Sequence, residues 1–245
     1  MLEINKIYNE DCFETLKRIN DKSVDMILQD PPYNITACDW EWDIMTKIQK
    51  FWAEWKRVIK DNGAIVMTAS QPFTSALVMS NVKKYKHHWI WEKEKGTGFA
   101  VAKYRPMMKT EDIIVFSYSK LNYHPIMNRR DKLLKYYFPT VKSDSNKIKN
   151  YSRGYVETWE KYPENIIKIK TSVGLHPTQK PVALFEYLIK TYTNEGDTVF
   201  DGFIGSGTTA VACINLKRNY IGCELSKKYF DIANERIKNL PIKLF

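Results

Sequence analysis

The segment that most constrains the fold is Asp197–Glu224, where a glycine-rich turn separates a short apolar run from helix-forming residues. Asp197–Phe200 predicts a strand and Ala210–Leu216 predicts a helix. In a strand, glycine turn and helix, backbone N–H groups point toward a ligand. A second predicted strand, Asn219–Glu224, ends in an acid about twenty residues on, a spacing typical of carboxylates that bind ribose hydroxyls. The segment therefore predicts part of a parallel α/β sheet that binds a ribose-containing ligand.

The turn itself, Asp201–Thr209, narrows the class of ligand. It departs from the Gly-x-Gly-x-x-Gly pattern of dinucleotide sites and lacks the Gly-Lys-Ser/Thr of phosphate-binding loops. ATP hydrolysis is therefore disfavoured. A ligand that has a ribose but no pyrophosphate fits the turn better.

A second motif, Asp30-Pro31-Pro32-Tyr33, follows the apolar run Val24–Leu28, which predicts a buried strand. Each proline fixes its own φ and restricts the residue before it, so Asp30 and Pro31 are held extended. A carboxylate and an aromatic ring are thereby presented at the carboxyl end of a strand, where open α/β sheets bind ligands. Alone, the motif is also compatible with a proline turn that closes a strand.

Strand and helix patterns alternate along most of the chain, which predicts a doubly wound, mostly parallel α/β sheet. The expected strands are 6–8, 24–28, 64–68, 87–91, 112–117, 198–200 and 220–223. The expected helices are 13–19, 48–59, 73–79, 182–192, 210–216 and 229–237. Residues 121–164 break this rhythm with a polar, Tyr-rich composition, and a loop of that length is functional or disordered in most domains.

Composition excludes several classes of protein. No apolar run is long enough to span a membrane, and no secretory signal is visible. The four cysteines form no Cys-x-x-Cys pair, and the histidines show no metal-ligand spacing, so we expect a reducing cytoplasm and no bound metal.

The net charge of +10 is unevenly distributed. Residues 121–170 hold eleven Lys/Arg and five Asp/Glu, together with seven tyrosines and phenylalanines and one tryptophan. Basic residues interleaved with aromatic ones are typical of surfaces that contact phosphates and bases. This part of the chain is therefore expected to bind nucleic acid.

Taken together, the motifs resemble those of the amino-directed DNA methyltransferases that use S-adenosylmethionine. That family has Asp/Asn/Ser-Pro-Pro-Tyr/Phe as its target motif and Asp-Pro-Phe-x-Gly-Ser-Gly-Thr-Thr as its cofactor loop. The chain matches them at Asp30–Tyr33 and Asp201–Thr209, and matches further family elements at His176–Pro181 and Gly222–Ile237. Gly202 stands where the family has proline, which we expect to loosen the backbone without removing a contact.

The resemblance implies a Rossmann-like sheet of seven strands with helices on both faces. It implies a catalytic domain of residues 1–120 and 165–245, and an inserted target recognition region of residues 121–164. Because the target motif precedes the cofactor loop, the order resembles the permuted β-type arrangement.

The resemblance also implies site residues. Asp30, Pro31, Pro32 and Tyr33 are the expected catalytic residues: Asp30 and the Pro31 carbonyl hold the amine of a flipped-out base, and Tyr33 stacks on it. The expected S-adenosylmethionine-binding residues are Asp11, Thr178, Lys180, Asp201, Phe203, Gly205, Ser206, Gly207, Thr208 and Glu224. Among these, Asp11 is placed at the adenine, Glu224 at the ribose and Lys180 at the methionine carboxylate; Asp11 is also a candidate helix cap.

The expected partner is double-stranded DNA, contacted by basic residues of the insert: Arg129, Arg130, Lys132, Lys135, Lys142 and Arg153. A homodimer and a cognate restriction endonuclease that does not associate stably are compatible with the family. The favoured reaction is methylation of adenine N6. Alternatives are methylation of cytosine N4, an RNA or protein-glutamine acceptor, and an inactive DNA-binding protein that still binds the cofactor.

Overall fold

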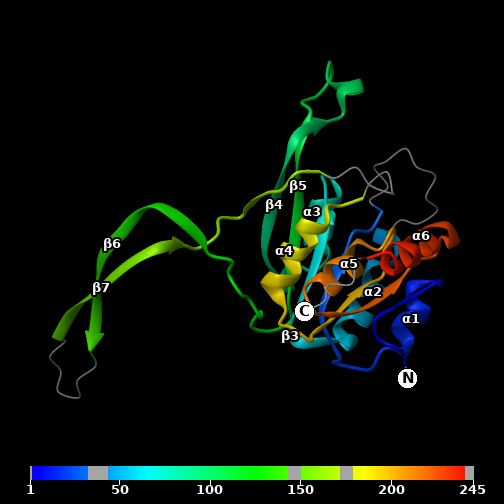
Figure 1. Ribbon diagram of the computed structural model, residues 1–245, viewed down its shortest axis with the longest axis horizontal. Coiled ribbons are helices and arrows are strands. Elements are labelled where there is room, and N and C mark those ends of the chain that lie inside the picture. Colours follow the sequence, from blue (N-terminus) through cyan, green and yellow to red (C-terminus); the bar gives the residue numbers. More distant parts are fainter. Residues whose placement is uncertain (1, 33–43, 143–149, 172–178, 241–245) are drawn as a thin grey trace. The chain divides into compact units, whose positions relative to one another are not determined.

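The computed structural model describes residues 2–32, 44–142, 150–171 and 179–240 (Figure 1). They belong to two compact units, Met1–His124 with Asn165–Phe245, and Pro125–Glu164. No helix within the described ranges is both long and apolar enough to cross a lipid bilayer.

The first unit contains one sheet with the strand order β1-β10-β9-β2-β3-β5-β4-β8 (Figure 1). Neighbouring strands are parallel except that β5 is antiparallel to both β3 and β4. The strands are β1 (Lys6–Tyr8), β2 (Val24–Gln29), β3 (Ile59–Ala69), β4 (Tyr85–Thr97), β5 (Met108–Phe116), β8 (Ile166–Lys168), β9 (Thr198–Asp201) and β10 (Asn219–Cys223).

The mostly parallel sheet confirms the expected fold class, and every expected strand is present. The sheet has eight strands rather than seven, however, because β8 adds to its edge by pairing in parallel with β4. This strand is only three residues long and lies in a lysine-rich stretch, so it leaves no periodic signal in the sequence.

Helices cover both faces of the sheet, as the doubly wound pattern predicts. They are α1 (Cys12–Arg18), α2 (Ile44–Val58), α3 (Phe73–Ser80), α4 (Val182–Tyr192), α5 (Thr208–Asn215) and α6 (Lys227–Lys238). Helices α1–α3 pack on the face that includes Ile27, whereas α4–α6 pack on the face that includes Met26 and Leu28. Consecutive residues of β2 thus enter opposite cores, which is why this strand is an apolar run rather than an alternating one.

The expected apolar stripe of α2 forms the centre of one core. Phe51, Trp52 and Trp55 are at most 5% exposed. Phe51 also stacks on Phe13 of α1, with the ring centroids 4.5 Å apart. Aromatic burial at helical spacing therefore fixes α2 and α1 against the same face of the sheet.

Two motif-bearing strands lie side by side at the centre of the sheet. Strand β2 pairs in parallel with β9, with Met26 opposite Val199 and Ile27 opposite Phe200. The connections lead away from this pair in opposite directions, to β10 and β1 on one side and to β3 on the other. The carboxyl ends of β2 and β9 therefore meet at a topological switch point, where open α/β sheets bind ligands.

Strands β4 and β5 are longer than the sequence predicts, because their paired ends continue beyond the rest of the sheet. Their pairing runs from Tyr85–Phe116 to Thr97–Met108, with a register shift between Glu92 and Thr97. Figure 1 shows this hairpin rising above the ends of the other strands. A short 3-10 helix, Phe99–Val101, lies at its tip.

The second unit is an antiparallel pair of long strands, β6 (Asn128–Lys142) and β7 (Asn150–Lys161). The sequence does not predict these strands, since charged and polar residues occupy both faces and leave no alternation to detect. A register shift between Arg129 and Leu134 further interrupts the pattern. The expected insert therefore contains two paired antiparallel strands that its sequence did not indicate.

Candidate active site

Asp30 follows the last residue of β2 and is the centre of a polar cluster. Its carboxylate accepts a hydrogen bond from the Thr68 hydroxyl of β3, and the Lys180 Nζ lies 2.8 Å from Oδ1 and 3.0 Å from Oδ2. The Asp30 side chain is 21% exposed, whereas that of Lys180 is only 8% exposed. Strand pairing up to Gln29 thus sets where Asp30 begins, and two donors set the orientation of its carboxylate.

The ion pair of Asp30 continues toward strands β5 and β4 as a chain of alternating charges. Lys180 Nζ lies 3.4 Å from Glu111 Oε2 on β5, and Glu111 Oε1 lies 3.0 Å from Lys93 Nζ on β4. Lys93 and Lys180 are both buried, at 5% and 7% exposure. Burying charged groups is costly unless they are paired, so the four residues form one unit, which we call the charge chain (Asp30, Lys180, Glu111, Lys93).

The glycine-rich turn begins at the end of β9. The side chain of Asp201, the last residue of β9, stabilises the turn by hydrogen bonds. This residue is 2% exposed, and its carboxylate accepts hydrogen bonds from the Phe203 N–H at 2.9 Å and from the Thr209 hydroxyl. Burial raises the pKa of Asp201 to about 7. The two hydrogen bonds of the Asp201 carboxylate thus join the start of the turn to the first residues of α5.

Two glycines of the turn have left-handed backbone that only glycine adopts easily. Gly205 has φ 52° and Gly207, which precedes α5, has φ 83°. A Cβ on Gly207 would also lie 3.1 Å from the Cβ of Ala233 in α6. The glycines therefore allow the turn to pack against α6 and leave its backbone open on the other side.

Glu224 follows β10 and faces the glycine turn. Its carboxylate accepts hydrogen bonds from the Gly205 N–H at 3.0 Å and the Ser226 N–H at 2.8 Å. Burial raises the pKa of Glu224, while these backbone donors act in the opposite direction. A half-buried carboxylate at the end of a strand, fixed by two backbone donors, is an acceptor positioned for hydroxyl groups.

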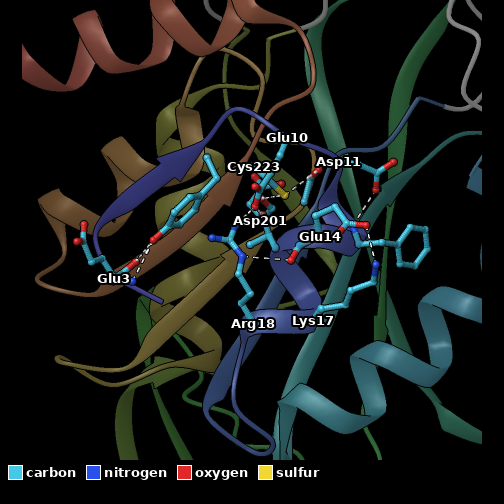
Figure 2. A network of polar contacts seen from close by, with 12 residues as sticks. Glu3, Glu10, Asp11, Glu14, Lys17, Arg18, Asp201 and Cys223 are labelled. Atoms are coloured by element: carbon cyan, nitrogen blue, oxygen red, sulfur yellow. Dashed lines mark hydrogen bonds and ion pairs between the residues drawn. The ribbon is translucent and has the colours of Figure 1, made fainter. Parts of the chain in front are cut away.

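Asp11 lies at the start of α1, where it forms the helix cap that the sequence allows. Its side chain accepts a hydrogen bond from the Phe13 N–H at 2.8 Å (Figure 2). Beside it, Glu10 binds the guanidinium of Arg18 and accepts a hydrogen bond from the Thr15 hydroxyl at 2.5 Å. Figure 2 shows these contacts close to Asp201 and Cys223, so α1 begins next to the glycine turn.

Arg236 and Gln179 fix the far side of the turn. Arg236 of α6 donates to the Ser206 carbonyl at 3.1 Å and to the Thr208 hydroxyl at 3.3 Å. The Ser206 hydroxyl donates to Gln179 Oε1 at 2.8 Å. Ser206 and Thr208 are both buried, and these hydrogen bonds of their side chains stabilise the conformation of the turn.

Comparison with known proteins identifies the chain. A family model described as DNA methylase, N6_N4_Mtase, matches residues 24–235. The chain belongs to the N6/N4 DNA methylase family. It is 32% identical to the type II methyltransferase M1.MboII of Moraxella bovis over 99% of the chain and the whole of that protein. It is 30% identical to M.HpaI of Haemophilus parainfluenzae over 92% of the chain and 72% of that protein.

Solved structures of similar proteins agree with this assignment. The crystal structure of the M1.HpyAVI–SAM complex has a TM-score of 0.63, is 27% identical, and matches 94% of the chain and 98% of its own. The cytosine-N4-specific PvuII DNA methyltransferase, with a TM-score of 0.67 and 15% identity over 98% and 88% of the two chains, shares the fold. The chain is a DNA methyltransferase that uses S-adenosylmethionine.

The described residues of the methylase fit this cofactor. Glu224 offers a carboxylate for ribose hydroxyls, and the Gly205–Gly207 backbone has no side chains to obstruct a ligand. Among the described residues, no three histidines, cysteines or acids are grouped as a metal site. Tyr33 and Thr178, both expected at the site, lie outside the described residues.

The structure brings most of the expected site residues of the methylase to one edge of the sheet. Lys180, however, contacts Asp30 and Glu111, which the sequence did not indicate; its expected place at the methionine carboxylate stays a prediction. Lys93 and Glu111 were missed. A signal existed for Lys93, since it continues the alternating positions of Trp89 and Trp91 on the same buried face, where an unpaired lysine is not expected.

Gly202 of the methylase makes a contact that the sequence did not indicate. Its N–H donates to the Gln29 side chain at 3.1 Å, a contact that the family's proline could not make because proline has no N–H. Gln29 is fully buried next to Asp30, and its amide nitrogen lies 3.4 Å from the Phe200 carbonyl. The glycine therefore adds a connection between the residue that precedes Asp30 and the glycine-rich turn.

We expect Gly202→Pro to destabilise the methylase by about 1–3 kcal/mol, even though proline is the residue typical of the family. The substitution removes the N–H donor and leaves Gln29 Oε1 buried without a hydrogen bond. Urea unfolding measures the change. The double variant with Gln29→Met, which removes the orphaned oxygen, should recover part of the loss. If the double variant loses the sum of the two single losses, the contact has no role.

We expect Asp201 to make the stability of the methylase pH-dependent. Its pKa is raised in the folded state, so the folded protein holds a proton that the unfolded chain has released between about pH 4 and pH 7. This contribution to stability is present below that range and is lost as the pH rises through about 7. As the pH rises from about 4 to 7, the free energy of unfolding of the wild type should fall relative to that of Asp201→Asn. If the two proteins show the same dependence on pH, the raised pKa of Asp201 is contradicted.

Proposed function

We propose that the methylase transfers the methyl group to the exocyclic N6 of adenine in double-stranded DNA. The observation that carries this proposal is the carboxylate of Asp30, held by Thr68 and Lys180 at the end of the strand next to the cofactor turn. In the family, an aspartate at the first position of this motif is more typical of adenine enzymes, whereas a serine is typical of many cytosine-N4 enzymes.

The chemical problem is the weak nucleophilicity of an aromatic amine, whose lone pair is delocalised into the ring. In our proposal, Asp30 and the Pro31 carbonyl accept the two amine hydrogens and favour a pyramidal nitrogen. The bound cofactor supplies an activated methyl group on a positively charged sulfur, which is a good leaving group. As the nitrogen–carbon bond forms and the carbon–sulfur bond breaks, Asp30 is placed to accept the proton that the nitrogen loses.

The remaining residues are assigned to holding and aligning the reactants. Glu224 binds the ribose hydroxyls, Asp11 lies at the adenine, and Phe203 lines the pocket. The backbone of Gly205–Gly207, with Ser206 and Thr208 beneath it, lines the site. Tyr33 is proposed to stack on the flipped-out base, since the amine cannot be reached within a duplex.

Glu224→Ala should weaken cofactor binding by about tenfold or more while leaving saturated turnover less affected, because one charge-assisted contact to the ribose is lost. Calorimetric titration with S-adenosylmethionine measures this directly. Glu235→Ala, in an exposed part of α6, removes the same charge and should bind normally. Equal affinities for wild type and Glu224→Ala would remove Glu224 from the ribose site.

One experiment tests the proposed acceptor. The methylase is incubated with isotopically labelled S-adenosylmethionine and unmethylated plasmid DNA, and the DNA is then digested to nucleosides. Label in N6-methyladenine supports the proposal. Label in N4-methylcytosine assigns the alternative amine, and label in neither nucleoside contradicts both assignments.

We further propose that the β6–β7 unit is the target recognition region and that the chain is of the permuted β-type. The expected DNA-contacting residues Arg129, Arg130, Lys132, Lys135, Lys142 and Arg153 all lie on these two strands. Lys135 forms an ion pair with Glu157 at 2.7 Å, so it is already partly neutralised. A homodimer and an independently acting restriction endonuclease remain the expected protein partners, in keeping with a cytoplasmic enzyme of a restriction–modification system.

A further inference from the structure

The part of the β4–β5 hairpin from Lys95 to Thr110, here called the β4–β5 extension, has no role in the site described above. From Thr97 to Thr110 every residue is exposed. Gly98, with φ 92°, turns the chain at the start of the short helix at the tip. The extension is therefore an ordered projection and not a packed part of the core (Figure 1).

Large apolar side chains are exposed on the extension. Phe99 and Tyr104 are 83% and 88% exposed, and Val101, Met107 and Met108 are between 36% and 43% exposed. Exposed apolar residues that occur singly need no explanation, but several within one short projection indicate a surface that binds a partner.

The charge of the extension indicates the chemistry of that partner. It carries Lys95, Lys103, Arg105 and Lys109 and no acidic residue. Lys109 is paired with Glu92 at 2.7 Å, whereas the described part of the chain supplies no carboxylate within ion-pair distance of Lys95, Lys103 or Arg105. Unneutralised cations interleaved with exposed aromatic rings suit a polyanion that also offers apolar surfaces, which is the chemistry of DNA.

The base of the extension lies at the catalytic carboxylate. Lys93 and Glu111, which flank the extension on β4 and β5, belong to the charge chain that ends at Asp30. A duplex whose target base reaches Asp30 therefore passes close to the point where the extension begins.

We propose that the β4–β5 extension is a second DNA-binding element of the methylase, separate from the β6–β7 unit. Lys103 and Arg105 bind backbone phosphates beside the target base, and Phe99 and Tyr104 enter the stack that the flipped base has left. Apolar wedges of this kind are used by proteins that distort DNA. The inference rests on double-stranded DNA being the substrate.

The test compares two variants with the wild type, using a fluorescent mixed-sequence duplex and a series of salt concentrations. Lys103→Ala with Arg105→Ala should make the slope of log affinity against log salt shallower by about two, because each phosphate contact contributes about 0.9. The control, Lys56→Ala with Lys190→Ala, removes the same charge from exposed positions of α2 and α4 and should leave the slope unchanged. Lys103→Arg with Arg105→Lys keeps the charge and should keep the slope.

Phe99→Ala with Tyr104→Ala should leave the slope nearly unchanged but reduce single-turnover methylation of plasmid DNA by about tenfold or more, since stacking on bases is lost. Because all four side chains are exposed, thermal unfolding should not change. If both double variants behave as the wild type, the proposal is wrong. The proposal is also wrong if Phe99→Ala with Tyr104→Ala changes the molecular mass measured by sedimentation while Lys103→Ala with Arg105→Ala keeps the wild-type salt slope. That result would make the extension an interface between copies of the chain. A wild-type protein that methylates no DNA would instead contradict the proposed function.

Discussion

Asp30→Ala is expected to lower the rate of methyl transfer by about two to three orders of magnitude, the usual effect of removing one preorganised electrostatic partner of a transition state. Cofactor and DNA affinity should change little, because neither the glycine turn nor the basic surfaces depend on this carboxylate. Single-turnover transfer to plasmid DNA and calorimetric titration of S-adenosylmethionine measure the two properties separately.

Asp30→Asn serves as the shape-matched control for this variant. It keeps an acceptor oxygen but loses the negative charge next to Lys180, so it should be slower than the wild type while folding normally. Transfer at the wild-type rate by Asp30→Ala would exclude Asp30 from the reaction, whereas the same rate in Asp30→Asn would show that its negative charge is not needed.

Lys180→Met is expected to destabilise the methylase by about 3–5 kcal/mol and to abolish most of its activity. The substitution leaves Asp30 and Glu111 without the cation that lies between them, and breaking a buried ion pair costs far more than breaking an exposed one. Chemical denaturation measures the loss, and the transfer assay measures the effect on Asp30.

Lys6→Met provides the matched control for Lys180→Met. Lys6 also pairs with an acid, Glu3, at 2.8 Å, but both side chains are more than half exposed, so its removal should be hardly measurable. A double-mutant cycle of Lys180→Met with Glu111→Gln then isolates the coupling between the two residues. Equal losses for Lys180→Met and Lys6→Met would show that the charge chain has no energetic role.

Much of the fold could be predicted from the sequence because its elements carry strong local signals. The stripe of Phe51, Trp52 and Trp55 and the apolar runs of β2 and β9 mark buried elements without any knowledge of the partners. Proline at the Asp30 motif and glycine at Gly205 and Gly207 likewise act through their own backbone.

The parts that the sequence does not predict depend on neighbours that are distant in the chain. Glu111 reaches Lys180 across nearly seventy residues, and Gln29 meets Gly202 only because β2 and β9 are adjacent. The β6–β7 strands mix charged, polar and apolar residues without alternation, so no periodicity distinguishes them from a loop. Polar partnerships of this kind are set by the tertiary structure and have no local pattern.

The strand order also has a consequence for the synthesis of the protein. Strands β1 and β2 are made first, but β9 and β10, which lie between them in the sheet, are made last. A nascent chain that still lacks its final fifth has a sheet in which the two places between β1 and β2 are empty, so β1 has no neighbour to pair with. Such long-range pairing is slow to form, so the core of this enzyme should close only as its carboxyl-terminal strands leave the ribosome, and until then the unpaired edge of β2 is open to chaperones.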